Sequence, residues 1–188
     1  MSQAKTLTQA EIEQVLAYIA TRRFAMRNRV MLLTSFWSGM RVGEIASLKV
    51  GDVMNADGTV KNEVRLTAEQ TKGRQPRTVF LPQRLQTELQ RYMDVRRGTD
   101  ATQPLFVTAG AKTFSANVMA QHFFWLYKKA GIAGASSHSG RRTFLTNLAS
   151  KGISIRVLAS LAGHRSVNVT MKYLDANDNM KRNAVEMI

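Results

Sequence analysis

Hydrophobic positions near the start of the chain recur with the period of an α-helix. Thr8 and Glu11 have the spacing of a capping box, which predicts a helix that opens there and runs to about residue 21. The apolar face of this helix is formed by Ile12, Val15, Leu16 and Ile19. Two more segments with helical spacing follow, over 23–38 and 42–48.

The pattern changes to that of short strands over residues 59–82. Two groups of hydrophobic residues predict the strands: Val60, Val64 and Leu66, then Val79, Phe80 and Leu81. The polar segment 71–74 lies between them, as the tip of a hairpin would. Gly51-Asp52 has the composition of a turn, and residues 105–107 that of a third short strand.

The remaining sequence returns to helical spacing. Helices are predicted over 82–97, 115–130, 138–151, 154–162, 167–174 and 177–187. The aromatic residues of segment 115–130 favour a core helix over a surface that stacks on DNA bases. Since no repeat or long linker divides the chain, we expect one domain over 1–188, mainly α with a small antiparallel β-sheet (an α+β fold).

Net charge narrows the choice of partners. Lys and Arg number 27 against 13 Asp and Glu, which gives a formal charge of +14. An excess of this size indicates a polyanionic partner, whereas an ordinary basic surface would lie closer to balance. Membrane binding usually concentrates basic residues in one tail or helix, but here they are spread over the whole length. Nucleic acid is therefore favoured over a membrane surface.

The sequence also bears on the compartment. It has no cysteine, which excludes disulfides and thiolate metal sites. Residues 1–12 are mostly polar, unlike a signal peptide, and the apolar run over 30–37 is too short to span a bilayer. We expect a cytoplasmic, nucleoid-associated protein.

Residues with candidate chemistry lie in the last third of the chain. Tyr173 follows His164 by nine residues, and His138 and Arg141 are three residues apart, which places them on one face of a helix. Tyrosine, with a pKa of about 10, becomes a useful nucleophile where cations stabilise its phenolate and hold an anionic electrophile. The DNA phosphodiester is the obvious electrophile for so basic a chain. Taken singly, these residues have simpler explanations as helix caps, a surface arginine and a packed ring.

Two further cations lie upstream. Arg41 stands just inside a predicted helix start, where the helix dipole disfavours positive charge, and its use on an anion would explain this position. Lys72, at the predicted hairpin tip, could reach a bound ligand and donate a proton to it. Each alone is also explained as a solvated surface residue.

Other reaction classes fit the sequence poorly. Its acidic residues are few and scattered, without the convergence that a two-metal nuclease needs. It contains no P-loop and no glycine-rich dinucleotide motif. We therefore expect neither a metal nor a cofactor.

Together these motifs resemble the catalytic domain of the tyrosine recombinases, the phage integrase family. Segment 38–48, Ser-Gly-Met-Arg-Val-Gly-Glu-Ile-Ala-Ser-Leu, is similar to the family's first box. Lys72-Gly73 and the segment 77–82 resemble its hairpin lysine and returning strand. His138-Ser139-Gly140-Arg141 resembles its His-x-x-Arg box, and Gly163-His164 with Tyr173 resembles its last box. The similarity covers nearly the whole chain.

The resemblance implies the tyrosine recombinase catalytic-domain fold and a site-specific recombinase that needs neither ATP nor metal. The catalytic residues it implies are Arg41, Lys72, His138, Arg141, His164 and Tyr173. Tyr173 would attack the scissile phosphate to form a 3′-phosphotyrosyl link, while the two arginines hold the non-bridging oxygens. Lys72 would protonate the leaving 5′-oxygen, His138 would assist proton transfer at the tyrosine, and His164 would donate a hydrogen bond to the phosphate.

Double-stranded DNA is the partner that the resemblance implies. The residues expected to contact it are Lys72, Arg74, Arg77, Arg142 and Arg165. Two positions depart from the family's usual pattern: Gly140, where leucine is frequent, and Arg142, where histidine is frequent. A glycine within a helix is expected to weaken it by about 1 kcal/mol.

The ends of the chain raise questions of assembly. The catalytic domain begins almost at once, so we expect no N-terminal core-binding domain, as in a fragment or in a minimal single-domain form similar to the fimbrial-switch invertases. The tail, 174–188, is expected to dock on a neighbouring subunit. The resemblance implies a tetramer on synapsed DNA, a monomer in free solution and a DNA-bending accessory protein.

Other functions are also compatible with the sequence. A DNA-binding accessory protein could keep the recombinase fold without the reaction. A type IB topoisomerase or hairpin telomere resolvase would share the chemistry, but such enzymes usually carry additional domains. A membrane-surface protein is a more distant alternative.

Overall fold

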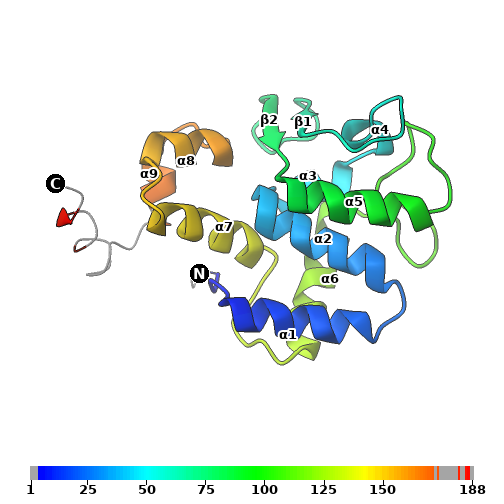
Figure 1. Ribbon diagram of the computed structural model, residues 1–188, viewed down its shortest axis with the longest axis horizontal. Helices are drawn as coiled ribbons and strands as arrows, with labels where there is room; N and C mark the ends of the chain where they lie inside the picture. Colours follow the sequence, from blue (N-terminus) through cyan, green and yellow to red (C-terminus); the bar gives the residue numbers. More distant parts are fainter. Residues whose placement is uncertain (1–3, 172, 174–181, 183–184, 187–188) are drawn as a thin grey trace.

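The computed structural model describes residues 4–171, 173, 182 and 185–186 (Figure 1). Its elements are, in order, α1 (Gln9–Ala20), α2 (Ala25–Ser38), α3 (Val42–Ser47), α4 (Val50–Val53), β1 (Glu63–Leu66), β2 (Arg77–Phe80), α5 (Gln83–Val95), α6 (Ala116–Lys129), α7 (Ser139–Ser150), α8 (Ile155–Ala162) and α9 (Val167–Met171). The predicted mainly helical fold with a small antiparallel sheet is confirmed. Within the described residues, no helix is long and apolar enough to cross a membrane. The helix predicted over 177–187 lies outside the described residues, apart from 182 and 185–186.

Side-chain caps explain where several helices begin. The Thr8 hydroxyl accepts a hydrogen bond from the amide of Glu11 at 3.2 Å, and the Glu11 carboxylate accepts one from the amide of Thr8 at 3.0 Å. The predicted capping box is therefore confirmed. Ser115 and Ser154 cap α6 and α8 with one such bond each.

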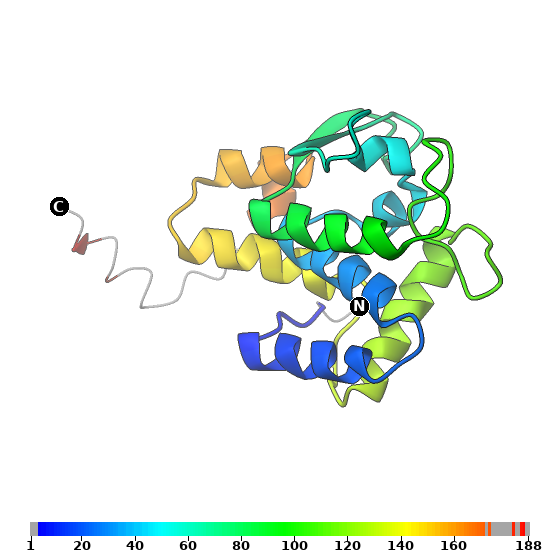
Figure 2. The same cartoon turned by 45° about the vertical axis from the view of Figure 1, so that its right-hand side comes forward.

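Helix α2 lies at the centre of the molecule and is buried on several sides (Figures 1 and 2). It packs against α1, α5 and α7, and its residues 30–33 are at most 1% exposed. Because α2 ends at Ser38, this buried helix fixes where the chain emerges immediately before Arg41.

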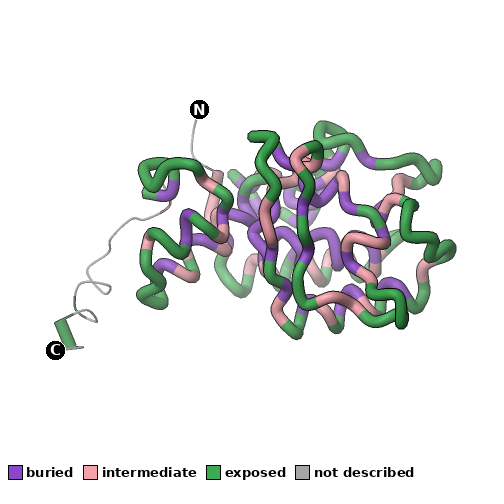
Figure 3. The backbone as a smooth tube through the Cα atoms, turned by 90° about the horizontal axis from the view of Figure 1, so that it is seen from above, coloured by how far each residue is buried: buried purple, intermediate pink, exposed green. Residues whose placement is uncertain are grey.

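A second, smaller hydrophobic cluster lies between α7 and α8. Its buried members are Leu145, Ala149, Leu158 and Ala162, and Phe144, Leu148 and Tyr173 pack against it. Figure 3 shows that buried positions gather toward the inside of the tube and that exposed positions predominate along the loops. Tyr173 thus lies beside a packed pair of helices.

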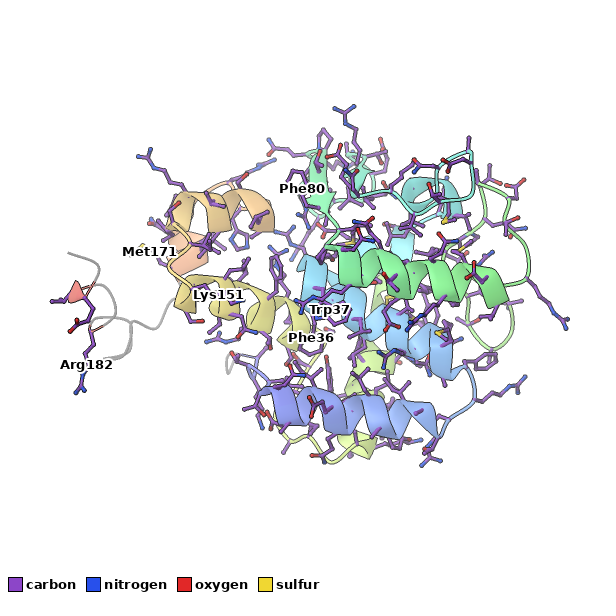
Figure 4. All side chains as sticks on the ribbon, in the orientation of Figure 1. Phe36, Trp37, Phe80, Lys151, Met171 and Arg182 are labelled. Carbon is purple, nitrogen blue, oxygen red and sulfur yellow. The ribbon has the colours of Figure 1, made fainter. Side chains whose placement is uncertain are left out.

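The sheet consists of β1 and β2, which pair antiparallel with Val64 opposite Val79. Phe80 on β2 is 58% exposed and stands on the outer surface (Figure 4). The prediction of a third strand over 105–107 is wrong. Pro104 and Val107 each form only an isolated bridge, with Lys49 and Thr113 respectively, and the missing N–H of proline prevents a continuous ladder at that point.

Two local predictions need qualification. Gly51-Asp52 lies within the short helix α4 rather than in a turn, because the Asp52 carboxylate accepts a hydrogen bond from the Lys49 amide at 2.8 Å and caps the helix. In α6, Phe123 and Tyr127 are buried as expected of a core helix. The two aromatic residues between them, Phe124 and Trp125, are instead 46% and 49% exposed, because they lie on the opposite face.

Gly140 has a packing reason that the sequence does not reveal. It lies in α7 where this helix crosses α2, and a Cβ atom placed on it would collide with the Ser35 hydroxyl and lie 2.8 Å from the Ser35 Cβ. Glycine therefore permits the close approach of the two helices that carry Arg141 and lead to Arg41. The sequence predicted only that Gly140 weakens α7, and did not predict this contact with Ser35.

The Gly140→Ala variant should be less stable than the wild type, although the same change in an open helix stabilises. We expect the free energy of unfolding to fall by roughly 1–3 kcal/mol, since overpacking forces two buried helices apart. Urea unfolding would measure it. The control is Gly110→Ala, because a Cβ there meets nothing within 4 Å. A more stable Gly140→Ala protein would contradict the packing argument.

Candidate active site

Arg41 is presented by a sharp reversal of the chain between α2 and α3. Gly39 makes the reversal with φ +64°, a conformation that favours glycine, and the ring of Phe144 covers it so closely that no side chain fits. The Arg41 guanidinium donates to Glu44 Oε1 at 2.9 Å, and its Nη2 lies 3.4 Å from the carbonyl oxygen of Gly163. The side chain remains 27% exposed, so part of its charge faces solvent.

Glu44 is the buried acceptor that holds Arg41. Its side chain is 1% exposed and accepts from the Arg41 amide at 2.7 Å and from Arg77 Nη2 at 2.7 Å. Burial raises the pKa of this carboxyl, but the hydrogen bonds and charges of Arg77 and then Arg41 outweigh burial and hold the pKa below its ordinary value. Glu44 is therefore ionised at neutral pH and is shared by two guanidinium groups.

Arg141 joins the ends of α2 and α8. It is 3% exposed, and it donates to the carbonyl oxygens of Gly39 at 2.7 Å and Ala162 at 2.5 Å. Burial and then the charge of Arg41 lower its pKa to about 10. It therefore remains a cation at neutral pH, with backbone carbonyls rather than a carboxylate as its hydrogen-bond partners.

The hydrogen bonds of His164 fix its tautomer. Arg141 Nη2 lies 2.9 Å from His164 Nε2, and Thr170 Oγ1 lies 2.9 Å from Nδ1. Since arginine can only donate, Nε2 accepts, and the neutral ring carries its proton on Nδ1. Burial, followed by the charges of Arg141, Arg41 and Arg77, lowers the pKa of His164 to about 4. Donation from Nε2 to a phosphate would first require protonation and release of Arg141.

Tyr173 stacks on His164. Their ring centroids are 5.7 Å apart, with an angle of 21° between the planes. The Arg142 guanidinium lies 5.8 Å from the tyrosine ring centroid, and the Thr146 hydroxyl donates to the Tyr173 carbonyl at 3.4 Å. The predicted nucleophile therefore stacks on His164, the residue predicted to donate a hydrogen bond to the phosphate.

An open cavity of about 500 Å³ lies beside these residues. Its lining includes Arg41, Lys72, Arg77, His164 and Arg165, and the hairpin segment 71–76 contributes much of its wall. Arg165 Nη2 donates to the Gly73 carbonyl at 2.9 Å, a hydrogen bond between two residues of the lining. As the structure describes it, the lining contains no Asp or Glu, so the cavity suits an anion.

His138 completes the group at the start of α7. It is the residue immediately before α7, three positions before Arg141, and burial and then the charges of Arg141, Lys72 and Arg41 lower its pKa. All six predicted catalytic residues therefore come together in space, although they are spread from residue 41 to 173. His138, Arg141 and Tyr173 lie beside the cavity rather than in its lining as described.

The predicted DNA contacts fall into two groups. Arg74 is exposed at the hairpin tip with φ +49°, and Arg165 is exposed beside it. Arg77 is instead 10% exposed, and its guanidinium is bonded to Glu44, although the residue also contributes to the cavity lining. Arg142 donates to the Thr6 hydroxyl at 3.3 Å. These four and Lys72 remain predictions, but the nitrogens of Arg77 are already bonded to Glu44 and to the Leu161 carbonyl.

Sequence reasoning missed the roles of Thr170 and Arg77. Thr170 is fully buried and fixes the His164 tautomer, and its position between His164 and Tyr173 was a usable signal. Arg77 has no comparable local signal, since its partners Glu44 and Leu161 are 33 and 84 residues away. Within the described residues, no three His, Asp or Glu side chains are grouped so as to hold a metal ion.

The model of the phage integrase family matches residues 5–180. The chain belongs to this family. The tyrosine recombinase XerA of Pyrococcus furiosus is 31% identical over 187 residues, which cover 97% of this chain and 61% of that protein. This integrase-family chain thus spans about three-fifths of the length of that relative.

Solved structures agree with this assignment. The crystal structure of XerA recombinase superposes with a TM-score of 0.79 and 26% identity, over 100% of this chain and 66% of that one. The Tn1549 transposon integrase, solved in complex with circular intermediate DNA, superposes with a TM-score of 0.75 and 20% identity, over 100% of this chain and 68% of that one. The helical fold described above is therefore the integrase-family fold.

Glu44→Gln should strongly destabilise this integrase-family domain. Removing the carboxylate leaves two guanidinium groups without their shared anion, and breaking such a buried pair costs about 3–5 kcal/mol. Because the folded-state pKa of Glu44 is depressed, its stabilisation is present above the ordinary pKa of 4.5 and is lost as pH falls through the folded-state value.

Urea unfolding at several pH values would measure this effect. The difference between Glu44→Gln and wild type should be large at pH 7 and should shrink in strong acid. Glu13→Gln is the control, since that exposed carboxylate bonds only a neutral side chain among its described contacts, Gln9, at 2.8 Å. Equal effects of the two substitutions at pH 7 would contradict the role assigned to Glu44.

Proposed function

We propose that the chain acts as a site-specific DNA recombinase that cuts and rejoins strands through a 3′-phosphotyrosyl intermediate. The observation that carries this proposal is the convergence of Arg41, Lys72, His138, Arg141, His164 and Tyr173 beside one cationic cavity. Family membership supports it, because the curated relative reported above is named a tyrosine recombinase.

The cavity would receive the scissile phosphate. Arg41 keeps part of its guanidinium exposed, and Lys72 and Arg165 lie at the rim. Guanidinium groups bind phosphate oxygens with charge-assisted hydrogen bonds and stabilise the charge that develops in a pentacoordinate transition state. Arg141 would contribute mainly through its charge, since two of its nitrogens are already held by carbonyl oxygens.

Bond making and proton transfer balance within this group. The Tyr173 oxygen forms a bond to phosphorus, and the bond from phosphorus to the 5′-oxygen breaks. His138 would accept the tyrosine proton, which its lowered pKa permits because the ring is neutral at neutral pH. Lys72 would give a proton to the leaving 5′-oxygen. A second 5′-hydroxyl then attacks the phosphotyrosine and rejoins the strands.

Neither a metal nor a cofactor enters this scheme, because the covalent link conserves the bond energy and the cations are side chains. Double-stranded DNA is the proposed substrate, with Arg74, Arg142 and Arg165 as further contacts. We propose a tetramer on synapsed DNA, with the tail 174–188 docked on a neighbouring subunit, and a monomer in its absence. Integration, excision or inversion would follow from how the two DNA sites are arranged.

An accessory DNA-binding protein without the reaction is the second candidate. One observation favours it: Tyr173 stacks on His164 beside the cavity and is not part of its described lining. Attack on a phosphate in the cavity would require the tyrosine ring to move. A nucleophile that never makes this movement would leave a protein that binds DNA without cutting it.

Tyr173→Phe should abolish formation of a covalent protein–DNA adduct. The phenyl ring keeps the stacking on His164 but lacks the oxygen that attacks phosphorus. The assay uses a library of nicked duplexes from DNA flanking the gene, in which cleavage releases a short strand and traps the adduct. Denaturing electrophoresis detects the protein shifted by bound DNA.

Tyr18→Phe is the matched control, because this tyrosine lies on α1 with Arg22 stacked at 4.6 Å from its ring, remote from the cavity. Wild type and Tyr18→Phe should give the same adduct. Salt-sensitive binding without any wild-type adduct would reject the recombinase and favour the accessory protein.

DNA binding should depend steeply on salt concentration, and Arg74→Gln should reduce that dependence. Removal of one ion pair with a phosphate lowers the slope of log affinity against log salt by about 0.9. Fluorescence anisotropy with labelled duplex DNA from about 50 to about 300 mM salt would measure the slope. Arg97→Gln is the control, since this exposed arginine follows α5, and Figure 1 shows α5 running away from β1 and β2. Identical slopes for the two variants would show that the hairpin tip does not contact DNA.

A further inference from the structure

The Arg77 side chain bonds both carboxylate oxygens of Glu44, whereas the Arg41 side chain bonds only one of them. It is the first residue of β2, immediately after the hairpin segment 67–76 that carries Lys72. Its Nε and Nη2 bond the two carboxylate oxygens of Glu44 at 3.3 and 2.7 Å, and its Nη1 donates to the Leu161 carbonyl at 2.7 Å. One buried side chain thus joins β2, α3 and the end of α8.

The backbone after Leu161 rests on this side chain. Gly163 has φ +61°, and a Cβ atom placed there would lie 2.5 Å from Arg77 Cδ and 3.2 Å from Nε. The residue that follows is His164, so Arg77 also supports the segment that presents this histidine. The close approach explains why a glycine precedes His164.

A second arginine, Arg165, also bonds this hairpin. Arg165, just after His164, donates to the carbonyl of Gly73, the neighbour of Lys72. This contact is exposed, whereas Arg77 is 10% exposed and pairs with a buried carboxylate. Charge-assisted hydrogen bonds are stronger when they are buried. The Arg77–Glu44 contact therefore holds the hairpin more strongly than the exposed Arg165–Gly73 contact.

We propose that Arg77 is a positioning residue that holds the Lys72 hairpin against Glu44 and Leu161 and so places the Lys72 ammonium over the phosphate cavity. This role rests on the proposed recombinase function. In this proposal Arg77 is not itself a phosphate ligand, because Nε, Nη1 and Nη2 all donate to protein acceptors. Lysine could not replace it fully, since one ammonium cannot bond both carboxylate oxygens and the Leu161 carbonyl in this geometry.

The step that depends on this placement is proton donation to the leaving group. As the Tyr173 oxygen bonds to phosphorus and the 5′-oxygen departs, Lys72 supplies the proton that makes the departing group an alcohol. A substrate with sulfur in place of the bridging 5′-oxygen leaves as a thiolate and needs no such proton, because thiols are far more acidic than alcohols. A variant in which Lys72 is misplaced should therefore cleave this substrate at nearly the wild-type rate.

The experiment uses the duplex that the wild-type protein traps as an adduct, in its ordinary form and with a 5′-bridging phosphorothiolate. The rate of adduct formation is measured on each form under single-turnover conditions with saturating protein. Arg77→Met should slow cleavage of the ordinary DNA by roughly 10- to 100-fold and cleave the phosphorothiolate at nearly the wild-type rate, like Lys72→Ala. DNA affinity should change little. Arg77→Lys should recover part of the rate on ordinary DNA.

Arg65→Met is the matched control, because this exposed residue lies on β1 opposite Thr78 and loses the same charge from the same sheet. It should cleave both substrates like the wild type. Equal slowing of Arg77→Met on both substrates would overturn the proposal, since the residue would then act through Arg41 or through stability. Absence of a wild-type adduct on either substrate would instead remove the recombinase function itself.

A second measurement does not depend on the reaction. Amide hydrogen exchange over 67–76 should become faster in Arg77→Met and Arg77→Lys than in Arg65→Met, because the hairpin loses its buried fastening. Unchanged exchange in a folded Arg77 variant would overturn the positioning role even if cleavage is impaired.

Discussion

The buried carboxylate of Glu44 is the interaction on which the site depends. Arg41, Arg77 and Arg141 approach one another at the ends of α2 and α8, and like charges repel strongly where little water remains. Glu44 lies between two of them and bonds both, so it offsets the repulsion and fixes their geometry. Without it, Arg41 would lose its anchor and the buried Arg77 its counter-ion. A residue that need not touch DNA therefore determines whether the cationic cavity can exist.

Most of the other partners of these arginines are neutral. The carbonyl oxygens of Gly39, Leu161, Ala162 and Gly163 accept from them, and all four lie at the C-terminal ends of α2 and α8. Helix C-termini offer unpaired carbonyls with partial negative charge, which stabilise a cation without neutralising it. Carboxylates in the same places would have held the arginines equally well but cancelled their charge. The site thus combines fixed geometry with a surplus of positive charge, the combination that binding a phosphate requires.

Sequence spacing predicted the order of the site residues because a motif places each one within a single turn or helix start. The capping box at Thr8 and the Gly-Met-Arg turn before Arg41 are of this local kind. Other features depend on contacts between residues that are distant in the chain and meet only after folding. Gly140 meets Ser35, Arg77 meets Leu161, and the segment predicted as a third strand meets Lys49. The family resemblance named the residues expected to meet the phosphate, whereas the buried contacts that hold them required coordinates.

The same surplus of charge determines how the histidines behave. Burial and neighbouring cations depress the pKa of His138 and lower that of His164 to about 4, so both rings are neutral at neutral pH. An anion placed among these cations opposes that effect, because it stabilises the protonated ring. A phosphate bound at the proposed site would therefore couple to proton uptake: His164 accepts from Arg141 in this structure, and its Nε2 could donate to a phosphate only once the ring is protonated. Under the proposed function, the arrangement that holds the cations together would thus also delay the histidine's change from acceptor to donor until a phosphate is bound.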